Sequence, residues 1–199
     1  MTQRIRCFTA IEISGSIKSQ IEKILYEFSS EFSDCVKWIT ENNIHLTLKF
    51  LKDFNYLHVR PLENEMKQKL CSIPIFQIKS RQIGFFPSAI NPRIVWLGIT
   101  APPQIKIIYD EIENITSTYG YHKENRSFTP HVTIGRIRNT AGKGQLLKLI
   151  DKVKSYSSLL APASMDVQEI ALIKSTLTPQ GPIYEQLFKI RLFSKNGLC

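Results

Sequence analysis

The sequence predicts a bilobal α+β fold, in which two mostly antiparallel sheets carry helices on the outside and are related by a pseudo-two-fold arrangement around a central groove. Helical stretches recur between pairs of strands, and there is no glycine-rich phosphate loop or long parallel strand–helix series. A short strand motif also occurs twice, with its histidines 86 residues apart in a chain of 199. We therefore expect one domain over residues 1–199, with two equivalent strands opposite each other.

Strand and helix periodicities alternate through the first half of the chain. Residues 4–13 carry apolar side chains on both faces, which is typical of a central strand. The turn Ser14-Gly15-Ser16 precedes a helix whose apolar residues recur at helical spacing from Ile17 to Phe28. The elements expected next are a strand at 35–39, a strand at 44–50 that ends near Leu51, a loop at 52–55 and a helix at 57–70 with Pro61 in its first turn.

The second half has the same character. Pro102-Pro103 marks the start of a helix that ends near Gly120, and Pro130 suits the beginning of the strand that follows it. The other expected elements are strands at 74–83 and 93–99, separated by Gly84-Phe85-Phe86-Pro87 and a loop through Pro92, and a strand at 131–136. A turn at 140–144, a helix at 146–153, and strands at 165–175 and 184–193 complete the chain.

The composition is that of a globular protein with a basic surface. Hydrophobic residues make up 43% of the chain, enough to bury a core without metals or disulfides. The 26 basic residues exceed the 17 acidic ones, which gives a net charge of +9. Such a charge favours polyanionic partners such as nucleic acid or nucleotides, although it is also compatible with a plain solvated surface.

The cysteines and the N-terminus indicate a cytoplasmic protein. Cys7, Cys35, Cys71 and Cys199 are scattered, without the paired spacing of a zinc site or a disulfide framework. The first apolar stretch is too short and wrongly flanked for a signal peptide or a membrane span. We expect a monomer that has no membrane partner.

The repeated motif places an imidazole and a hydroxyl on one face of a strand. His45 and Thr47 are two residues apart and alternate with apolar residues, as do His131 and Thr133. Residues i and i+2 of a strand point to the same face, and the apolar residues between them point to the core. One such motif is usually structural, but two copies in the same context favour a shared site.

Two histidines and two threonines suit phosphodiester hydrolysis. An imidazole titrates near pH 6.5, so one histidine can accept a proton from water while the other donates one to the leaving oxygen. The threonine hydroxyls can donate hydrogen bonds to phosphate oxygens. No further ligand recurs beside either motif, so we predict neither a metal nor a cofactor. His58 and His122 lack this context and are expected to be surface residues.

The sequence resembles the 2H phosphoesterase superfamily, and specifically the bacterial and archaeal RNA 2′,3′-cyclic phosphodiesterases, historically called 2′-5′ RNA ligases. The resemblance spans essentially the whole chain. It is carried by the segments 45–50 and 131–136, and by Arg6-Cys7-Phe8-Thr9-Ala10-Ile11, Val36-Lys37-Trp38, Phe85-Phe86-Pro87, residues 92–98, Phe128-Thr129-Pro130, Ser175 and Gly181-Pro182-Ile183-Tyr184.

This resemblance implies metal-independent hydrolysis of RNA or nucleoside 2′,3′-cyclic phosphate ends to 2′-phosphomonoesters. His45 would be the proton donor to O3′, and His131 would be the proton acceptor that activates water. Because the two motifs are nearly symmetric, the sequence alone is equally compatible with the reverse assignment. Thr47 and Thr133 would bind the phosphate. The alternatives are a 2′-5′ RNA ligase and a non-catalytic module that binds RNA ends.

The same resemblance implies that Phe50 and Arg136 bind the base, by stacking of an aromatic ring and a guanidinium. Strand parity opposes this, because an offset of five residues puts each side chain on the face opposite to its histidine. A β-bulge or a strand end would reconcile the two, and Gly135 could mark such a bulge. Without one, Phe50 would lie in the core and Arg136 would be a solvated charge.

Overall fold

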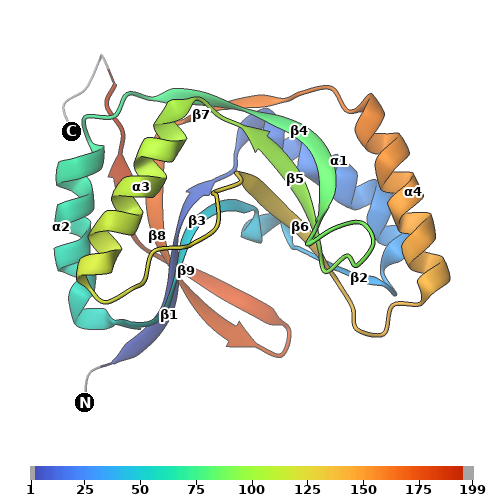
Figure 1. Cartoon of the computed structure of the whole chain (residues 1–199), viewed down its shortest axis with the longest axis horizontal. Helices are drawn as coiled ribbons and strands as arrows, with labels where there is room; N and C mark the ends of the chain where they lie inside the picture. The colour runs from blue at the N-terminus through green and yellow to red at the C-terminus, as the bar shows by residue number, and fades with distance from the viewer. Residues whose placement is uncertain (1–2, 195–199) are drawn as a thin grey trace.

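The computed structural model describes residues 3–194, which form one nine-stranded sheet and four α-helices (Figure 1). The strands are β1 (Arg4–Glu12), β2 (Val36–Trp38), β3 (His45–Asn55), β4 (Phe76–Phe86), β5 (Ile94–Thr100), β6 (His131–Ile137), β7 (Ser164–Val167), β8 (Glu169–Thr178) and β9 (Gly181–Arg191). The helices are α1 (Gly15–Phe32), α2 (Val59–Leu70), α3 (Pro103–Thr118) and α4 (Lys143–Leu159), and short 3₁₀ turns at Glu41–Asn43 and Tyr56–His58 flank β3.

The sheet consists of two halves that meet at the two motif strands. Its order is β7-β4-β5-β6-β3-β1-β8-β9, with β2 paired to β6, and the pairing between its strands is antiparallel. Within the described residues, strands β3 and β6 are joined by the one register pair of Leu46 with Val132. The predicted bilobal α+β fold is therefore confirmed, and the two predicted sheets are continuous through this pair.

The helices cover the two halves separately. Helices α2 and α3 pack together beside β3 and β9, on the left of Figure 1, while α1 and α4 lie on the right beside β7, β2 and β4. Helix α1 follows β1 in the chain but packs in the other half, so the connection crosses the junction. This crossing holds the two halves together near the motif strands.

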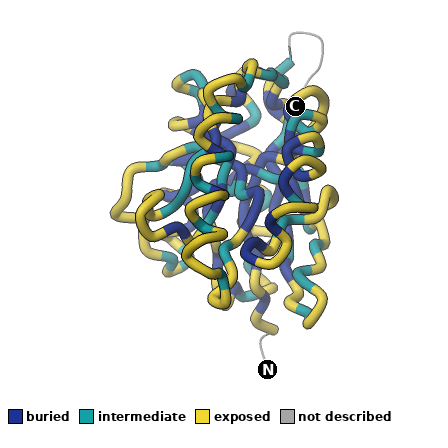
Figure 2. Tube along the Cα trace, turned by 90° about the vertical axis from the view of Figure 1, so that its right-hand side faces the viewer, coloured by how far each residue is buried: buried dark blue, intermediate teal, exposed yellow. Residues whose placement is uncertain are grey.

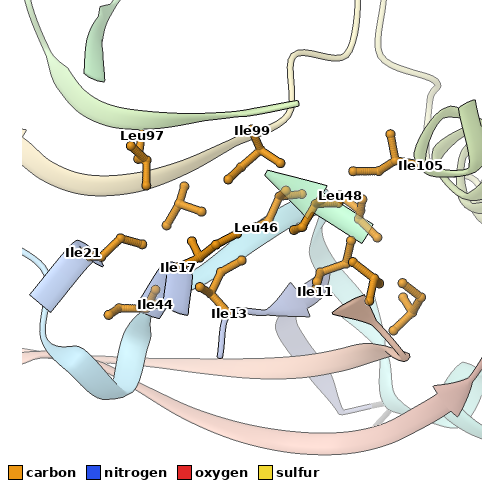
Figure 3. Close-up of a cluster of buried hydrophobic side chains, with 14 of the residues drawn as sticks. Ile11, Ile13, Ile17, Ile21, Ile44, Leu46, Leu48, Leu97, Ile99 and Ile105 are labelled. Carbon is orange, nitrogen blue, oxygen red and sulfur yellow. The ribbon is translucent and has the colours of Figure 1, made fainter. Parts of the chain in front are cut away.

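The main core lies between the sheet and the helices. Leu46, Leu48 and Leu97 contribute to it from two strands of the sheet, together with isoleucines of α1 and α3 (Figure 3). The outer faces of the helices are exposed, whereas the central strands are buried (Figure 2). A second, smaller cluster occupies the other face of β1 and β8, and consists of Phe8, Ala10, Ala171 and Ile173 with the partly buried Tyr184 packed against it.

Three strand predictions were wrong. Strand β3 runs on to Asn55 instead of ending near Leu51, and Asp53 has a left-handed φ of 52° within it. Strand β4 continues through Gly84 to Phe86 instead of ending at Ile83, because Gly84 leaves space for the indole of Trp96. The single strand expected at 165–175 is two strands, since β7 pairs with β4 in one half and β8 with β1 in the other.

Smaller differences concern helix length and histidine placement. Helix α4 is longer than the expected 146–153, because it extends on both sides of its buried residues, Leu149 and Val153. His58 is half-buried beside the rings of Phe54 and Tyr119, whereas His122 is exposed as expected. Cys199 lies outside the described residues. Among the helices of residues 3–194, none has the length and apolarity required to cross a membrane.

Candidate active site

The two motifs lie side by side where the halves of the sheet meet. Leu46 and Val132 are opposite each other and fully buried in the core. The residues that precede and follow them therefore point to the other face, and they are half-buried there. These four residues are His45, Thr47, His131 and Thr133.

The antiparallel register gives this group the shape of a square. On either side of the Leu46–Val132 pair, His45 lies opposite Thr133 and Thr47 lies opposite His131. Directly opposite Cβ atoms in such a register are about 4.5–5.5 Å apart, and diagonal ones about 7–8 Å. The two histidines thus occupy diagonal corners of this group.

Both imidazoles are oriented by the same backbone contact. The Nδ1 atom of His45 lies 2.8 Å from the carbonyl oxygen of Asn43, and that of His131 lies 2.7 Å from the carbonyl oxygen of Thr129. A carbonyl oxygen only accepts hydrogen bonds, so Nδ1 carries the proton in the neutral ring. Each Nε2 is left free to accept a proton, or to donate one when the ring is protonated.

Aromatic rings pack against each imidazole. The His45 ring stacks on Phe8 of β1 at 4.6 Å and meets the edge of Tyr184 at 5.4 Å. The His131 ring meets Phe86 edge-on at 4.9 Å, and Phe86 packs against Trp96 at 5.0 Å. The two halves of the site are therefore built alike, from neighbouring strands on the same face of the sheet.

Burial makes both histidines weaker bases than usual. Loss of solvation lowers the pKa of His45 below its ordinary value of 6.5, and the positive charge of Arg136 lowers it further, against the raising effects of the Asn43 carbonyl and Glu12. Loss of solvation also lowers the pKa of His131, against the effect of the Thr129 carbonyl. In the free protein, both rings are thus predominantly neutral at pH 7.

A β-bulge brings Phe50 onto the same face as His45. Thr9 pairs with Lys49 and Ala10 with Thr47, so the register skips Leu48. Leu48 and Lys49 are both buried, and the alternation restarts with Phe50, whose side chain is 52% exposed and lies 5.7 Å from the ring of Phe8. The parity conflict found in the sequence is therefore resolved by a bulge.

A matching bulge turns Arg136 toward the site. Val95 pairs with Gly135 and Trp96 with Thr133, so the register skips Ile134. Ile134 and Gly135 are buried, while Arg136 is exposed and close enough to lower the pKa of His45. A Cβ atom on Gly135 would lie 2.6 Å from Cγ1 of Val36, so this position of the bulge requires glycine.

Replacement of Gly135 by alanine is expected to destabilise the fold by about 1–3 kcal/mol, because the added methyl group overpacks the contact with Val36 and Trp38. Denaturant unfolding measures this loss. Gly144→Ala is the matched control, since its Cβ atom meets nothing within 4 Å and the residue lies in helix α4. Equal stability of the two variants would contradict the packing account of the bulge.

The first bulge also buries a charged side chain that holds the loop before β6. Lys49 Nζ lies 2.6 Å from Glu113 Oε2 of α3 and donates to the carbonyl oxygen of His122 at 2.9 Å. The backbone N–H of Glu124 donates to the same Glu113 oxygen at 3.0 Å. The loop that leads to His131 is therefore tied to the strand that carries His45.

A cavity adjoins the site at Phe50. It has a volume of about 380 Å³ and lies between β1, β3 and the loop at residues 121–124, without including either motif histidine. Among residues 3–194, no group of three or more histidine, cysteine, aspartate or glutamate side chains could hold a metal ion. The side chains gathered at and beside the square carry imidazole, hydroxyl and guanidinium groups.

Several residues of the site carry no local signal in the sequence. Phe8 touches the rings of His45, Phe50 and Tyr184, yet its strand reads as apolar on both faces. Tyr184 reaches His45 from β9, more than a hundred residues away in the chain. Only their presence in the segments that carry the family resemblance singled them out.

Comparison with known proteins finds a matching family and curated relatives over most of the chain. The family described as "LigT like Phosphoesterase" matches residues 11–96 and 97–184, and each match contains one histidine–threonine motif. The chain is 34% identical to the RNA 2′,3′-cyclic phosphodiesterase of Methanocaldococcus jannaschii over 91% of this chain and 97% of that protein. It is 29% identical to the protein of the same name from Thermotoga maritima, over 93% of this chain and 94% of the relative.

Solved structures share the fold at lower identity. E. coli LigT in complex with 3′-AMP superposes with a TM-score of 0.74 at 22% identity, over 96% of this chain and all of that chain. TT0787 of Thermus thermophilus gives the same TM-score at 20% identity, with the same coverage.

Proposed function

This chain belongs to the LigT-like phosphoesterase family, and from that premise we propose that it hydrolyses the 2′,3′-cyclic phosphate ends of RNA, or of single nucleosides, to 2′-phosphomonoesters without a metal ion. The observation that carries the proposal is the square of two histidines and two threonines at the β3–β6 junction. Curated relatives at about the same length bear the name RNA 2′,3′-cyclic phosphodiesterase, which supports the same reaction.

In the proposed reaction the cyclic phosphate lies between the two Nε2 atoms. His131 accepts a proton from water, the water oxygen forms a bond to phosphorus, and the bond from phosphorus to O3′ breaks. His45 donates its proton to O3′, which leaves as a hydroxyl group. One water is consumed, and the product carries a 2′-phosphate and a free 3′-hydroxyl.

Thr47 and Thr133 are proposed to hold the phosphate during this step. Neither hydroxyl is engaged by a hydrogen bond from another side chain in residues 3–194. Each threonine lies beside one histidine along its strand and opposite the other histidine across the pair. Hydroxyl donors at these two corners would bind the nonbridging oxygens and stabilise the charge that develops on them.

The base is proposed to lie between Phe50 and Arg136. The exposed Phe50 ring offers an apolar face backed by Phe8, and the Arg136 guanidinium can stack on the other side of a base. Burial lowers the pKa of His45 and raises that of Tyr184. The positive charge of Arg136 acts to lower both pKa values, which agrees with a position of Arg136 close to His45 and Tyr184. The terminal nucleotide would thus extend from the square toward β1 and β3.

The pH dependence of kcat/KM should be bell-shaped, with its maximum below about pH 6.5, because one histidine must be protonated and the other neutral. The pKa values of His45 and His131 in the free protein are both lowered. The histidine that donates a proton loses it as the pH rises through this range, and the histidine that accepts one becomes protonated as the pH falls through it. In the complex, the phosphate anion raises the pKa of the protonated ring, so the maximum of kcat should lie at higher pH.

Rates measured from pH 4.5 to 9 with adenosine 2′,3′-cyclic phosphate test this prediction. A monotonic profile of kcat/KM, or a maximum clearly above about pH 6.5, would contradict the pairing of two histidines in these environments.

The function itself is tested with a short RNA that ends in a 2′,3′-cyclic phosphate, incubated in EDTA. Appearance of a phosphomonoester end supports hydrolysis, and loss of the activity in EDTA would contradict the metal-independent chemistry. A second RNA with a 5′-hydroxyl, added to the same reaction, reveals ligation: joining that outpaces hydrolysis would favour a 2′-5′ RNA ligase. Tight, salt-sensitive binding without any product would favour a non-catalytic module.

A further inference from the structure

The cavity beside Phe50 lies outside the square and includes neither motif histidine. Its walls include Arg6 of β1, Lys52 of β3, and Tyr121, His122 and Glu124 of the loop before β6. Its volume of about 380 Å³ is in the range of small-molecule sites. Phe50 also lines the cavity and is 52% exposed. The side of this cavity nearest the square is therefore an aromatic ring that a base could cover.

The cavity has a surplus of positive charge. Neither Arg6 nor Lys52 forms an ion pair with a carboxylate within residues 3–194. Lys49 also borders the cavity, but its charge is compensated by Glu113. Glu124 is the carboxylate among the lining residues, so two uncompensated cations face one anion. An anionic group is favoured near Arg6 and Lys52.

A series of ring contacts connects the square to the cavity. The His45 ring is 4.6 Å from Phe8, and the Phe8 ring is 5.7 Å from Phe50. The guanidinium carbon of Arg6 then lies 6.0 Å from the centre of the Phe50 ring. Arg6 therefore lies next to the ring over which a base beside the square would stack.

Resting on the proposed function, we propose that Arg6 and Lys52 bind the phosphodiester on the 5′ side of the terminal nucleotide, so that the cavity holds the penultimate nucleotide of an RNA. A groove that combines an aromatic platform with cations is the usual means of holding single-stranded nucleic acid. The site would then favour RNA ends over free nucleoside cyclic phosphates.

A different exit from the square would lead past Lys37. Lys37 of β2 pairs directly with Arg136 of β6, and both are exposed. Like charges at opposite positions of a sheet are unfavourable, so this pair could also receive an anion. We favour the exit past Phe50 because a cavity and an exposed ring adjoin its cations. Lys37→Ala is therefore the discriminating variant.

The test compares kcat/KM for two substrates: adenosine 2′,3′-cyclic phosphate and the dinucleotide ApA that ends in a 2′,3′-cyclic phosphate. The wild-type protein is expected to prefer the dinucleotide by roughly tenfold, and Lys52→Ala to lower this ratio roughly fivefold, as expected for exposed charge contacts. A dinucleotide with an uncharged methylphosphonate linkage should have no such advantage in kcat/KM over adenosine 2′,3′-cyclic phosphate. Lys148→Ala, which removes an exposed charge on α4, should keep the wild-type ratio.

Each outcome decides the proposal. A ratio unchanged in Lys52→Ala, or lowered as much in Lys37→Ala, overturns the assignment of the subsite. Equal use of the charged and methylphosphonate dinucleotides overturns it as well. If both substrates are hydrolysed with nearly equal kcat/KM, the proposed function stands and only the subsite is contradicted. If neither substrate is hydrolysed, the proposed function and the subsite are both contradicted.

Discussion

Replacement of His131 by asparagine should lower kcat by about 10²–10⁴, the contribution expected of a general acid or base, and His45→Asn should have a similar effect. Each Nε2 is the free nitrogen of a ring whose Nδ1 is fixed by a backbone carbonyl. An asparagine amide can reproduce a hydrogen bond to that carbonyl, but it cannot transfer a proton near pH 7. Single-turnover rates with a cyclic-phosphate substrate measure the chemical step.

The double variant should be little slower than the slower single variant. The two histidines act in one step, and losses from groups that act as a unit are not additive. His58→Asn is the matched control, because that ring is half-buried between aromatic side chains at the other end of β3. A loss of less than tenfold in either motif variant, or an equal loss in His58→Asn, would contradict the assigned roles.

Replacement of Lys49 by methionine should cost about 3–5 kcal/mol in the free energy of unfolding. The side chains of Lys49 and Glu113 are only 2% and 5% exposed, so removal of the ammonium group leaves a carboxylate buried without its partner. One oxygen of Glu113 already lacks a hydrogen-bond partner within the described residues. Denaturant unfolding gives the change, and the loop at residues 121–124 should lose protection from hydrogen exchange because Lys49 and Glu113 both bind its backbone.

The exposed pair between Lys106 and Asp110 provides the control. These side chains are 65% and 48% exposed, so Lys106→Met should change the stability by less than about 1 kcal/mol. The double variant Lys49→Met, Glu113→Leu should recover part of the loss, because no buried charge remains. Equal effects of Lys49→Met and Lys106→Met would show that burial of the first pair has no energetic consequence.

Periodicity was sufficient to predict the α+β class and the two motif strands. Alternation at His45 to Leu48 and at His131 to Ile134 reports which side chains share a face, and the structure preserves that order up to each bulge. The two-fold repetition also predicted that the motif strands are equivalent. They do lie next to each other, joined at Leu46 and Val132.

Beyond the bulges, local periodicity could not predict the structure. Each bulge depends on partners from elsewhere in the chain: Glu113 compensates the buried Lys49, and Val36 and Trp38 fill the space over Gly135. The same limit explains why the break at Gln168 was missed, where the chain passes from the strand paired with β4 to the strand paired with β1. Packing between residues far apart in the chain determines where the bulges and this break lie, and the residues next to them in the sequence give no signal of it.

The roles assigned to the four residues of the square predict one product. Adenosine 2′,3′-cyclic phosphate should be converted to adenosine 2′-phosphate, because the proton donated by His45 is proposed to go to O3′. Chromatography against authentic 2′- and 3′-phosphates, with water labelled with oxygen-18, identifies both the broken bond and the origin of the new oxygen. A 2′-phosphate that carries one labelled oxygen on phosphorus is the predicted result, and a 3′-phosphate or the absence of label on phosphorus would contradict it.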